Sequence, residues 1–286
     1  MKNSFFGNLR INEISPSFAL KPYISCYYIY ENSEDRKQDF FFRALPNGLV
    51  EMFYFFNGSR IIFQENRQKR FLSGFLTGIF ELDHPMKIKI EVNGRPFRGI
   101  SILFTYLGVN RLLGIDLYET TNKVLHFDEF WNSDTYWEFV NTLQIGNEKV
   151  LFMSINDFFL HQIDAGDHPT QKIIPVLNSI EQMTGPLSVE RVAGRLHISY
   201  KRLYRMFVDE LGMTPKMYLK ILRFNRACFM LDRLKEADET EIIYHCGYYD
   251  QAHFIHEFKT IMKESPRRYL RTSRGNFYIN RPYAFK

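Results

Sequence analysis

Cationic and hydrogen-bonding side chains stand at helical spacing shortly after residue 200. Tyr204 and Arg205 lie three and four positions after Lys201, so on a helix all three point to the same side. The opposite side of such a helix is apolar and includes Leu203 and Phe207. Lysine and arginine neutralise DNA phosphates, and arginine also donates paired hydrogen bonds to guanine in the major groove. The stretch therefore has the composition of a helix that lies against nucleic acid.

The same stretch occurs a second time, 51 residues further on. Tyr204–Lys220 aligns with Ile255–Arg271 at an offset of 255 − 204 = 51. Identical residues coincide at Phe207 and Phe258, Pro215 and Pro266, Tyr218 and Tyr269, and Leu219 and Leu270. Self-similarity at a fixed offset indicates a repeated supersecondary unit, which two copies make a duplication. In the second copy the outward side carries Ala252, Ile255, His256 and Lys259, with Gln251 at its edge.

Capping residues predict a helix, a turn and a second helix in the first copy. Ser188 is a good N-cap for a short helix, and His197 and Ile198 form the turn. Ser199 then caps the helix that carries Lys201 to Arg205, and Gly212 ends it. A short helix, a tight turn and a helix with a basic outer face form the helix-turn-helix pattern, whose second helix enters the DNA major groove.

The second copy has the same order of elements. A helix is predicted for Thr240–Cys246, a turn for Gly247–Tyr249, and a further helix capped by Asp250. In both copies an N-cap and a proline, at Thr214–Pro215 and Ser265–Pro266, predict that a new helix follows. The helix from Pro215 has about the length needed to join the two copies rigidly.

These residues resemble the DNA-binding domain of the AraC/XylS family of bacterial transcription regulators. The resemblance rests on the runs Leu211–Leu231, Cys246–Lys259 and Ser265–Arg271. Two positions depart from the family pattern: Ile243 stands where a small alanine is usual, and Lys263 where glycine is common.

The resemblance implies residue roles and partners. Base contacts are expected from Lys201, Tyr204 and Arg205 in the first unit, and from Gln251, Ala252, Ile255 and His256 in the second. Lys259 is expected to contact a phosphate. The partners that follow are double-stranded DNA, a second copy of the chain, a small-molecule effector and RNA polymerase.

Charge is distributed unevenly along the 286 residues. From Lys172 onward there are 20 Lys and Arg against 12 Asp and Glu, a net charge of +8. The whole chain has 37 and 32, which leaves 17 and 20 before Lys172, a net charge of −3. The basic excess coincides with the duplicated units, as expected of a DNA-binding domain.

The cysteines and the N-terminal sequence bear on location. Cys26, Cys228 and Cys246 are an odd number without CxxC spacing, which is typical of reduced thiols. The first residues lack the apolar run of a signal peptide, and no stretch has the length of a membrane span. We therefore expect a cytoplasmic protein without a membrane partner.

Before about Tyr106 the sequence is rich in short aromatic and aliphatic runs, which predict strands of a small barrel or sandwich. Met86–Val92 alternates strictly, and Asn93–Gly94 followed by Phe97–Tyr106 predicts a hairpin. Further on, a helix capped by Ser133–Asp134 and a second from about Glu148 to Ile163 are expected either to pack on the core or to form a dimer interface.

The predicted fold class is α+β, with a β-rich barrel or sandwich followed by an all-α domain. The expected boundaries are residues 1–165 for the β-rich effector-binding or dimerisation domain, 172–273 for the double helix-turn-helix domain and 274–286 for a tail. The polar segment Asp164–Gln171, which contains Gly and Pro, is the predicted linker.

The first half resembles, more weakly, the β-rich sensor domains that precede such DNA-binding domains, through Leu45–Phe56 and Leu112–Trp131. That resemblance implies effector binding or dimerisation. Glu51 is the candidate effector ligand if its strand points it inward; otherwise it is an exposed or salt-bridged strand residue. The histidines of the first half form no HxH or HxxxE pair, and the chain has no GxGxxG, Walker loop or GxSxG elbow, so neither a metal, a cofactor nor a catalytic residue is predicted.

The sequence thus predicts a sequence-specific DNA-binding transcription regulator without enzymatic activity. It leaves open the effector, the target promoters, the oligomeric state and the choice between activation and repression. One alternative is a constitutive DNA binder whose first half is only a scaffold. Another is an enzyme with a DNA-binding tail, which would need a reactive cysteine or a four-cysteine metal site.

Overall fold

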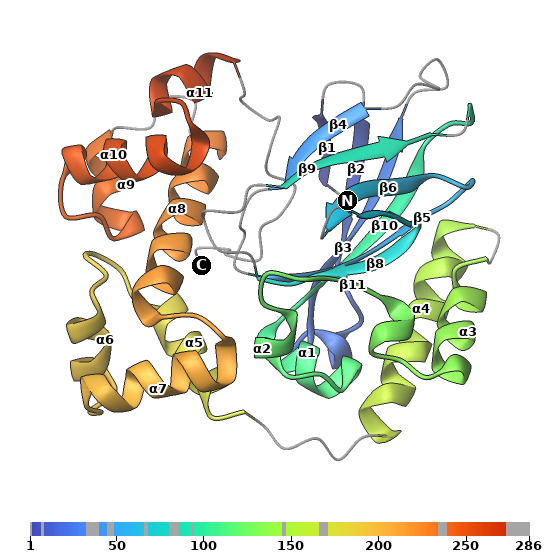
Figure 1. Ribbon diagram of the computed structural model, residues 1–286, viewed down its shortest axis with the longest axis horizontal. Coiled ribbons are helices and arrows are strands. Elements are labelled where there is room, and N and C mark those ends of the chain that lie inside the picture. Colours follow the sequence, from blue (N-terminus) through green and yellow to red (C-terminus); the bar gives the residue numbers. More distant parts are fainter. Residues whose placement is uncertain are drawn as a thin grey trace. The chain divides into compact units, whose positions relative to one another are not determined.

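The computed structural model describes residues 2–6, 9–32, 40–44, 49–65, 68–79, 86–92, 94–144, 147–165, 171–233 and 239–272 (Figure 1). Asn93 of the predicted hairpin turn, most of the predicted linker and the predicted tail lie outside these residues. Close contacts divide the chain into two compact units, one mainly of residues before Lys172 and the other mainly of residues from Lys172 onward. The layout confirms the α+β class, with strands in the first unit and helices alone in the described part of the second after Lys172.

The first unit contains two β-sheets. The larger one has seven strands in the spatial order β1 (Lys2–Phe6), β2 (Leu9–Ile14), β3 (Ile24–Asn32), β10 (Arg98–Phe104), β5 (Val50–Phe55), β8 (Gly74–Thr77) and β11 (Val124–His126). Its neighbouring strands are antiparallel. The smaller sheet has the order β4 (Phe40–Ala44), β9 (Met86–Glu91), β6 (Arg60–Glu65) and β7 (Gln68–Leu72).

The predicted hairpin between β9 and β10 is wrong, because these strands belong to different sheets. Strand β9 pairs with β6, and the Arg60 guanidinium meets the Glu91 carboxylate across that pair at 2.8 Å. Strand β10 lies between β3 and β5 and hydrogen-bonds both of them. With both edges occupied, β10 has none left for β9. Every residue of β10 after Arg98 is buried, on both faces of the strand, which is typical of a central strand.

Helices cover one face of the seven-stranded sheet (Figure 1). Tyr27 of β3 and Phe104 of β10 contact Phe152 and Phe159, with ring centroids 5.4 and 5.7 Å apart. The helices of this unit are α1 (Tyr106–Leu113), α2 (Leu117–Thr120), α3 (Ser133–Thr142) and α4 (Glu148–Ala165). The two predicted helices are confirmed as α3 and α4, with the cap of α3 at Asn132 rather than at Ser133.

The described helices from Lys172 onward form the second unit. They are α5 (Ile173–Glu181), α6 (Val189–Arg195), α7 (Tyr200–Leu211), α8 (Pro215–Arg233), α9 (Glu239–Cys246), α10 (Gln251–Met262) and α11 (Pro266–Thr272). In Figure 1, α5 to α7 and α9 to α11 form two groups, and the long helix α8 runs from one to the other. No helix in the described residues combines the length and hydropathy that a membrane span requires.

Local capping chemistry produces this helical order, as the sequence predicts. The hydroxyls of Ser188 and Ser199 accept hydrogen bonds from Arg191 N and Arg202 N, each 3.2 Å away. The Asp250 carboxylate accepts from His253 N at 2.7 Å. These bonds satisfy amide groups that have no partner within the helix, so each helix begins where its cap stands.

Helices α7 and α10 end in the same way although their terminal residues differ. Gly212 and Lys263 are both left-handed, with φ of 70° and 60°, and each amide donates to the carbonyl four residues earlier. A lysine in this conformation is strained, since its Cβ approaches the following carbonyl. The lysine therefore leaves the helix end unchanged but costs stability.

Replacing Lys263 with glycine should raise the free energy of unfolding of the helical unit by about 0.5–1 kcal/mol, because glycine adopts φ > 0 without strain. Urea unfolding followed by far-ultraviolet circular dichroism would measure the change. Both tryptophans, Trp131 and Trp137, lie in the first unit, so tryptophan fluorescence reports on that unit separately.

Gly212→Ala is the matched control and should lower the same free energy by about 1 kcal/mol, since alanine would then carry the strain. A Lys263→Gly protein that is less stable than the parent would contradict the assignment of strain to Lys263.

Candidate nucleic-acid interface

The outward face of α7 carries the residues predicted for it. Lys201, Tyr204 and Arg205 are exposed to solvent, whereas Leu203 and Phe207 are fully buried. Other exposed residues of α7, none of them predicted to contact DNA, are Tyr200, Arg202, Val208 and Asp209. The Tyr200 and Tyr204 rings stack along the helix with centroids 6.3 Å apart. Tyr200 lies four residues before Tyr204, so helical spacing in the sequence already places it on the same face.

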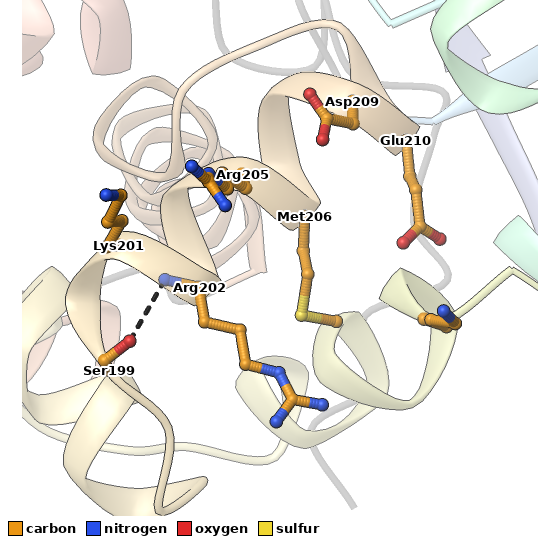
Figure 2. A pocket seen from close by; sticks show the side chains of 8 residues that line it. Ser199, Lys201, Arg202, Arg205, Met206, Asp209 and Glu210 are labelled. Carbon is orange, nitrogen blue, oxygen red and sulfur yellow. Dashed lines mark hydrogen bonds between the residues drawn. The ribbon is translucent and has the colours of Figure 1, made fainter.

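A hollow of about 350 Å³ borders α7. Figure 2 shows the lysine and arginine side chains on the N-terminal half of the helix and two carboxylates on its C-terminal half. The lining residues are Lys172, Ser199, Lys201, Arg202, Arg205, Met206, Asp209 and Glu210. The Glu210 carboxylate accepts a hydrogen bond of 3.0 Å from Ile173 N and so caps α5. The positively charged end of this hollow therefore lies at the N-terminal half of α7, where the helix dipole also attracts anions.

The predicted residues of α10 also share one face. Gln251, Ala252, His256 and Lys259 are exposed and Ile255 is partly exposed. Phe254 and Phe258, on the other side, are fully buried and hold the helix against α8 and α11 through Phe224 and Tyr269. Each set of predicted residues is thus gathered on the solvent side of one recognition helix.

A buried ion pair joins α8 to α10. Arg223 Nη2 lies 2.8 Å from Glu257 Oε2, and Arg223 Nε donates to Glu257 Oε1 at 3.2 Å. Both side chains are under a tenth exposed. Arg223 Nη1 also donates to the carbonyl of Leu187, which precedes α6. One guanidinium therefore holds a segment of the first helix-turn-helix unit and the recognition helix of the second.

Arg226, one turn further along α8, has a related role. Its guanidinium donates to the carbonyls of Met183 and Glu181 at 2.7 Å and of Ile180 at 3.3 Å. These carbonyls lie at or just beyond the end of α5, where the last carbonyl groups of a helix have no N–H donor within the helix. Neither arginine was predicted from the sequence to join the two units, although two guanidinium groups in the mostly apolar run Ile221–Leu231 were a signal.

The turn of the second unit contacts the loop before α6 directly. Leu187 N donates to Gly247 O at 3.1 Å, and Gly247 has φ of 90°. A Cβ on Gly247 would lie 2.8 Å from Leu187 Cγ, so only glycine fits this approach. Together with the two arginines, this contact packs the two helix-turn-helix units into one body.

In the first unit, Glu51 is buried and only 1% exposed, which excludes the exposed alternative. Its carboxylate accepts hydrogen bonds from Ser101 Oγ at 2.5 Å and Tyr30 Oη at 3.3 Å. Burial, together with the nearby Glu51 carboxylate, raises the pKa of Tyr30 well above its usual value, so Tyr30 is a stable hydrogen-bond donor. The three residues share the face of the large sheet that is opposite to Tyr27 and Phe104.

The part of the chain that the structure describes contains no group of three His, Cys, Asp or Glu residues placed to hold a metal ion. The thiols of Cys26, Cys228 and Cys246 are buried and form no disulfide. Burial raises the pKa of the Cys26 thiol to about 12 and also raises the pKa of the Cys246 thiol.

Both parts of the chain match known protein families. Residues 192–272 match the family described as a helix-turn-helix domain, and residues 12–126 match a domain of unknown function, DUF6597. The HTH-type transcriptional activator RhaS of Escherichia coli O157:H7 is 38% identical over 88 residues, which are 31% of this chain and 31% of RhaS. The match thus spans less than a third of that relative. It confirms the resemblance stated for the second unit.

The solved structures that match this chain include ToxT from Vibrio cholerae O395. It is 15% identical with a TM-score of 0.47, over 87% of this chain and 97% of ToxT. The C-terminal domain of AraT, a response regulator from Geobacillus stearothermophilus, is 33% identical with a TM-score of 0.31, over 34% of this chain and 82% of that domain.

Glu257→Ala should lower the free energy of unfolding of the helical unit by about 3–5 kcal/mol, because it leaves the Arg223 guanidinium buried without its carboxylate. Circular dichroism in urea measures the loss, and tryptophan fluorescence of the first unit serves as an internal reference.

Glu264→Ala is the matched control, since Glu264 pairs at 3.7 Å with Arg268, whose side chain is 74% exposed. Because the Arg268 end of this pair lies in solvent, the pair should contribute less than about 1 kcal/mol. Similar losses for the two variants would show that the buried pair does not hold α8 to α10.

Proposed function

We propose that this chain, whose residues 192–272 form a helix-turn-helix domain of the AraC/XylS type, is a sequence-specific DNA-binding transcription regulator. The observation that carries the proposal is the pair of recognition helices, α7 and α10, each with its selected residues on the solvent side. The buried arginine contacts of α8 support it, since they hold the two helices in one body. The similarity to the transcriptional activator RhaS supports it further.

In this proposal the two helices enter the major groove. Lys201, Tyr204 and Arg205 of α7 contact base edges, with Arg205 hydrogen-bonding a guanine. Gln251, Ala252, Ile255 and His256 contact bases from α10. Lys259, one turn beyond His256, contacts a phosphate and fixes the position of the helix without distinguishing bases.

The division of labour follows the domain boundaries proposed from the sequence. Residues 172–273 bind DNA, residues 1–165 bind an effector or a second copy of the chain, and residues 274–286 are a tail. Within the first domain, Glu51, whose buried carboxylate is held by Tyr30 and Ser101, is the candidate for contact with a polar effector.

The proposed partners are DNA, a second copy of the chain, an effector and RNA polymerase, and the proposed location is the cytoplasm. We propose no enzymatic activity. A catalytic cysteine needs a lowered pKa and solvent access, whereas the thiols of this chain are buried and burial raises the pKa of Cys26 to about 12. The alternative of a constitutive DNA binder has the same α7 and α10 contacts and gives the first domain a scaffold role.

Arg205→Ala should reduce discrimination between a selected DNA site and a scrambled duplex by about 1–3 kcal/mol, because the bidentate guanine contact is lost. Lys259→Ala is the matched cation-to-alanine control, and it should weaken binding to both duplexes alike. Fluorescence anisotropy with the full chain on each labelled duplex measures both effects.

The DNA site used in this experiment is obtained by selecting, from a random DNA library, the sequences that the full chain binds. Failure to select any sequence would contradict the proposed function as a whole. Equal losses on the selected and scrambled duplexes for Arg205→Ala would contradict only the base contact assigned to that residue.

A further inference from the structure

The two recognition helices present different chemistry at matching positions. The offset of 51 residues places α10 on α7 with the same N-cap position, Ser199 and Asp250, and the same left-handed end. Where α7 has Lys201, Tyr204 and Arg205, α10 has Ala252, Ile255 and His256. Two of the three matched positions thus change from a long side chain with a polar end to an aliphatic one.

The aliphatic residues of α10 lie at the surface, not in the core. Ala252 is exposed and Ile255 partly exposed, while the buried side of the helix is formed by Phe254, Phe258 and their neighbours. Packing of the domain therefore does not account for an alanine and an isoleucine at these two positions. Solvent-facing apolar groups gain free energy when a partner removes them from water.

Some polar side chains at the start of α10 are bonded within the domain, and another is exposed to solvent. Asp250 caps the helix, and His253 is held by Tyr249 N at 3.3 Å, by Glu257 at 3.5 Å and by the ring of Tyr248. Both are therefore engaged within the domain. Gln251, in the same first turn, is exposed, and its side-chain amide is of the kind that hydrogen-bonds a base edge.

We infer that α10 recognises A·T base pairs, with Ala252 and Ile255 against thymine methyl groups and the Gln251 amide on adenine. Thymine is the one base with a methyl group in the major groove, and glutamine matches the donor and acceptor of adenine there. The inference rests on the proposed function and specifies the DNA that it requires. A half-site with guanine under α7 therefore adjoins a half-site with A·T pairs under α10.

The test replaces thymine by deoxyuridine, which removes the 5-methyl group and keeps the base pair. Each thymine of a duplex selected by the full chain is changed in turn, and Kd is measured by fluorescence anisotropy. Burial of a methyl group predicts that Kd rises about three- to fivefold at a contacted thymine. Since only the DNA changes, folding of the protein is not affected.

Two variants assign the effect to α10. In Ile255→Ala the penalty at one or more of these thymines should fall below about 1.5-fold, because the partner of the methyl group is gone. Ile243→Ala makes the same change on α9 of the same unit and should keep the full penalty. Circular dichroism confirms that both variants retain their helices.

The outcomes separate this inference from the proposed function. A chain that selects a site but shows no deoxyuridine penalty at any thymine overturns the inference alone. A penalty that persists unchanged in Ile255→Ala overturns it as well, since the methyl contact would then belong to other residues. A chain that selects no DNA sequence overturns the proposed function and this inference together.

Discussion

The buried ion pair between Arg223 and Glu257 is the interaction on which the geometry of the second unit depends. A guanidinium and a carboxylate inside a protein are tolerated only when they are closely paired and further hydrogen-bonded. Here the third guanidinium nitrogen of Arg223, Nη1, donates to the carbonyl of Leu187, and Arg226 donates to three carbonyls at the end of α5. Any rotation of one helix-turn-helix unit against the other would leave these charges unpaired. The two recognition helices therefore share one rigid support.

Because the support is rigid, the differences in side chains between α7 and α10 are held at fixed positions relative to each other. Because the helices cannot rearrange independently, each presents its own chemistry at a fixed position. The face of α7 is cationic and aromatic, whereas that of α10 is aliphatic at the matching positions. The first unit also contains a buried charged side chain with hydrogen-bond partners: Glu51 is held by Tyr30 and Ser101. In both units a buried charge with defined partners stands beside the surface or face to which we assign recognition.

Local chemistry could be predicted from the sequence, and long-range pairing could not. Ser188, Ser199 and Asp250 determine where helices begin through bonds to amides three residues away, so their effect is visible in the sequence. The partners of β10 lie far away in the chain, and the turn signal at Asn93–Gly94 suggested a wrong neighbour. The partners of Arg223 and Arg226 are distant too, which is why α8 was predicted only as a connecting helix. The outward faces of α7 and α10 followed from helical period alone.

The spacing of the DNA site tests most directly the claim that both recognition helices bind DNA as one body. If they do, one chain contacts two successive major grooves, about 10–10.5 base pairs apart on one side of the duplex. Inserting about five base pairs between the half-sites turns one groove to the opposite side of the helix. We predict that specific binding of the full chain, measured by footprinting and anisotropy, is lost on the lengthened duplex. Unchanged affinity, or protection of a single groove per chain on the original site, would contradict it.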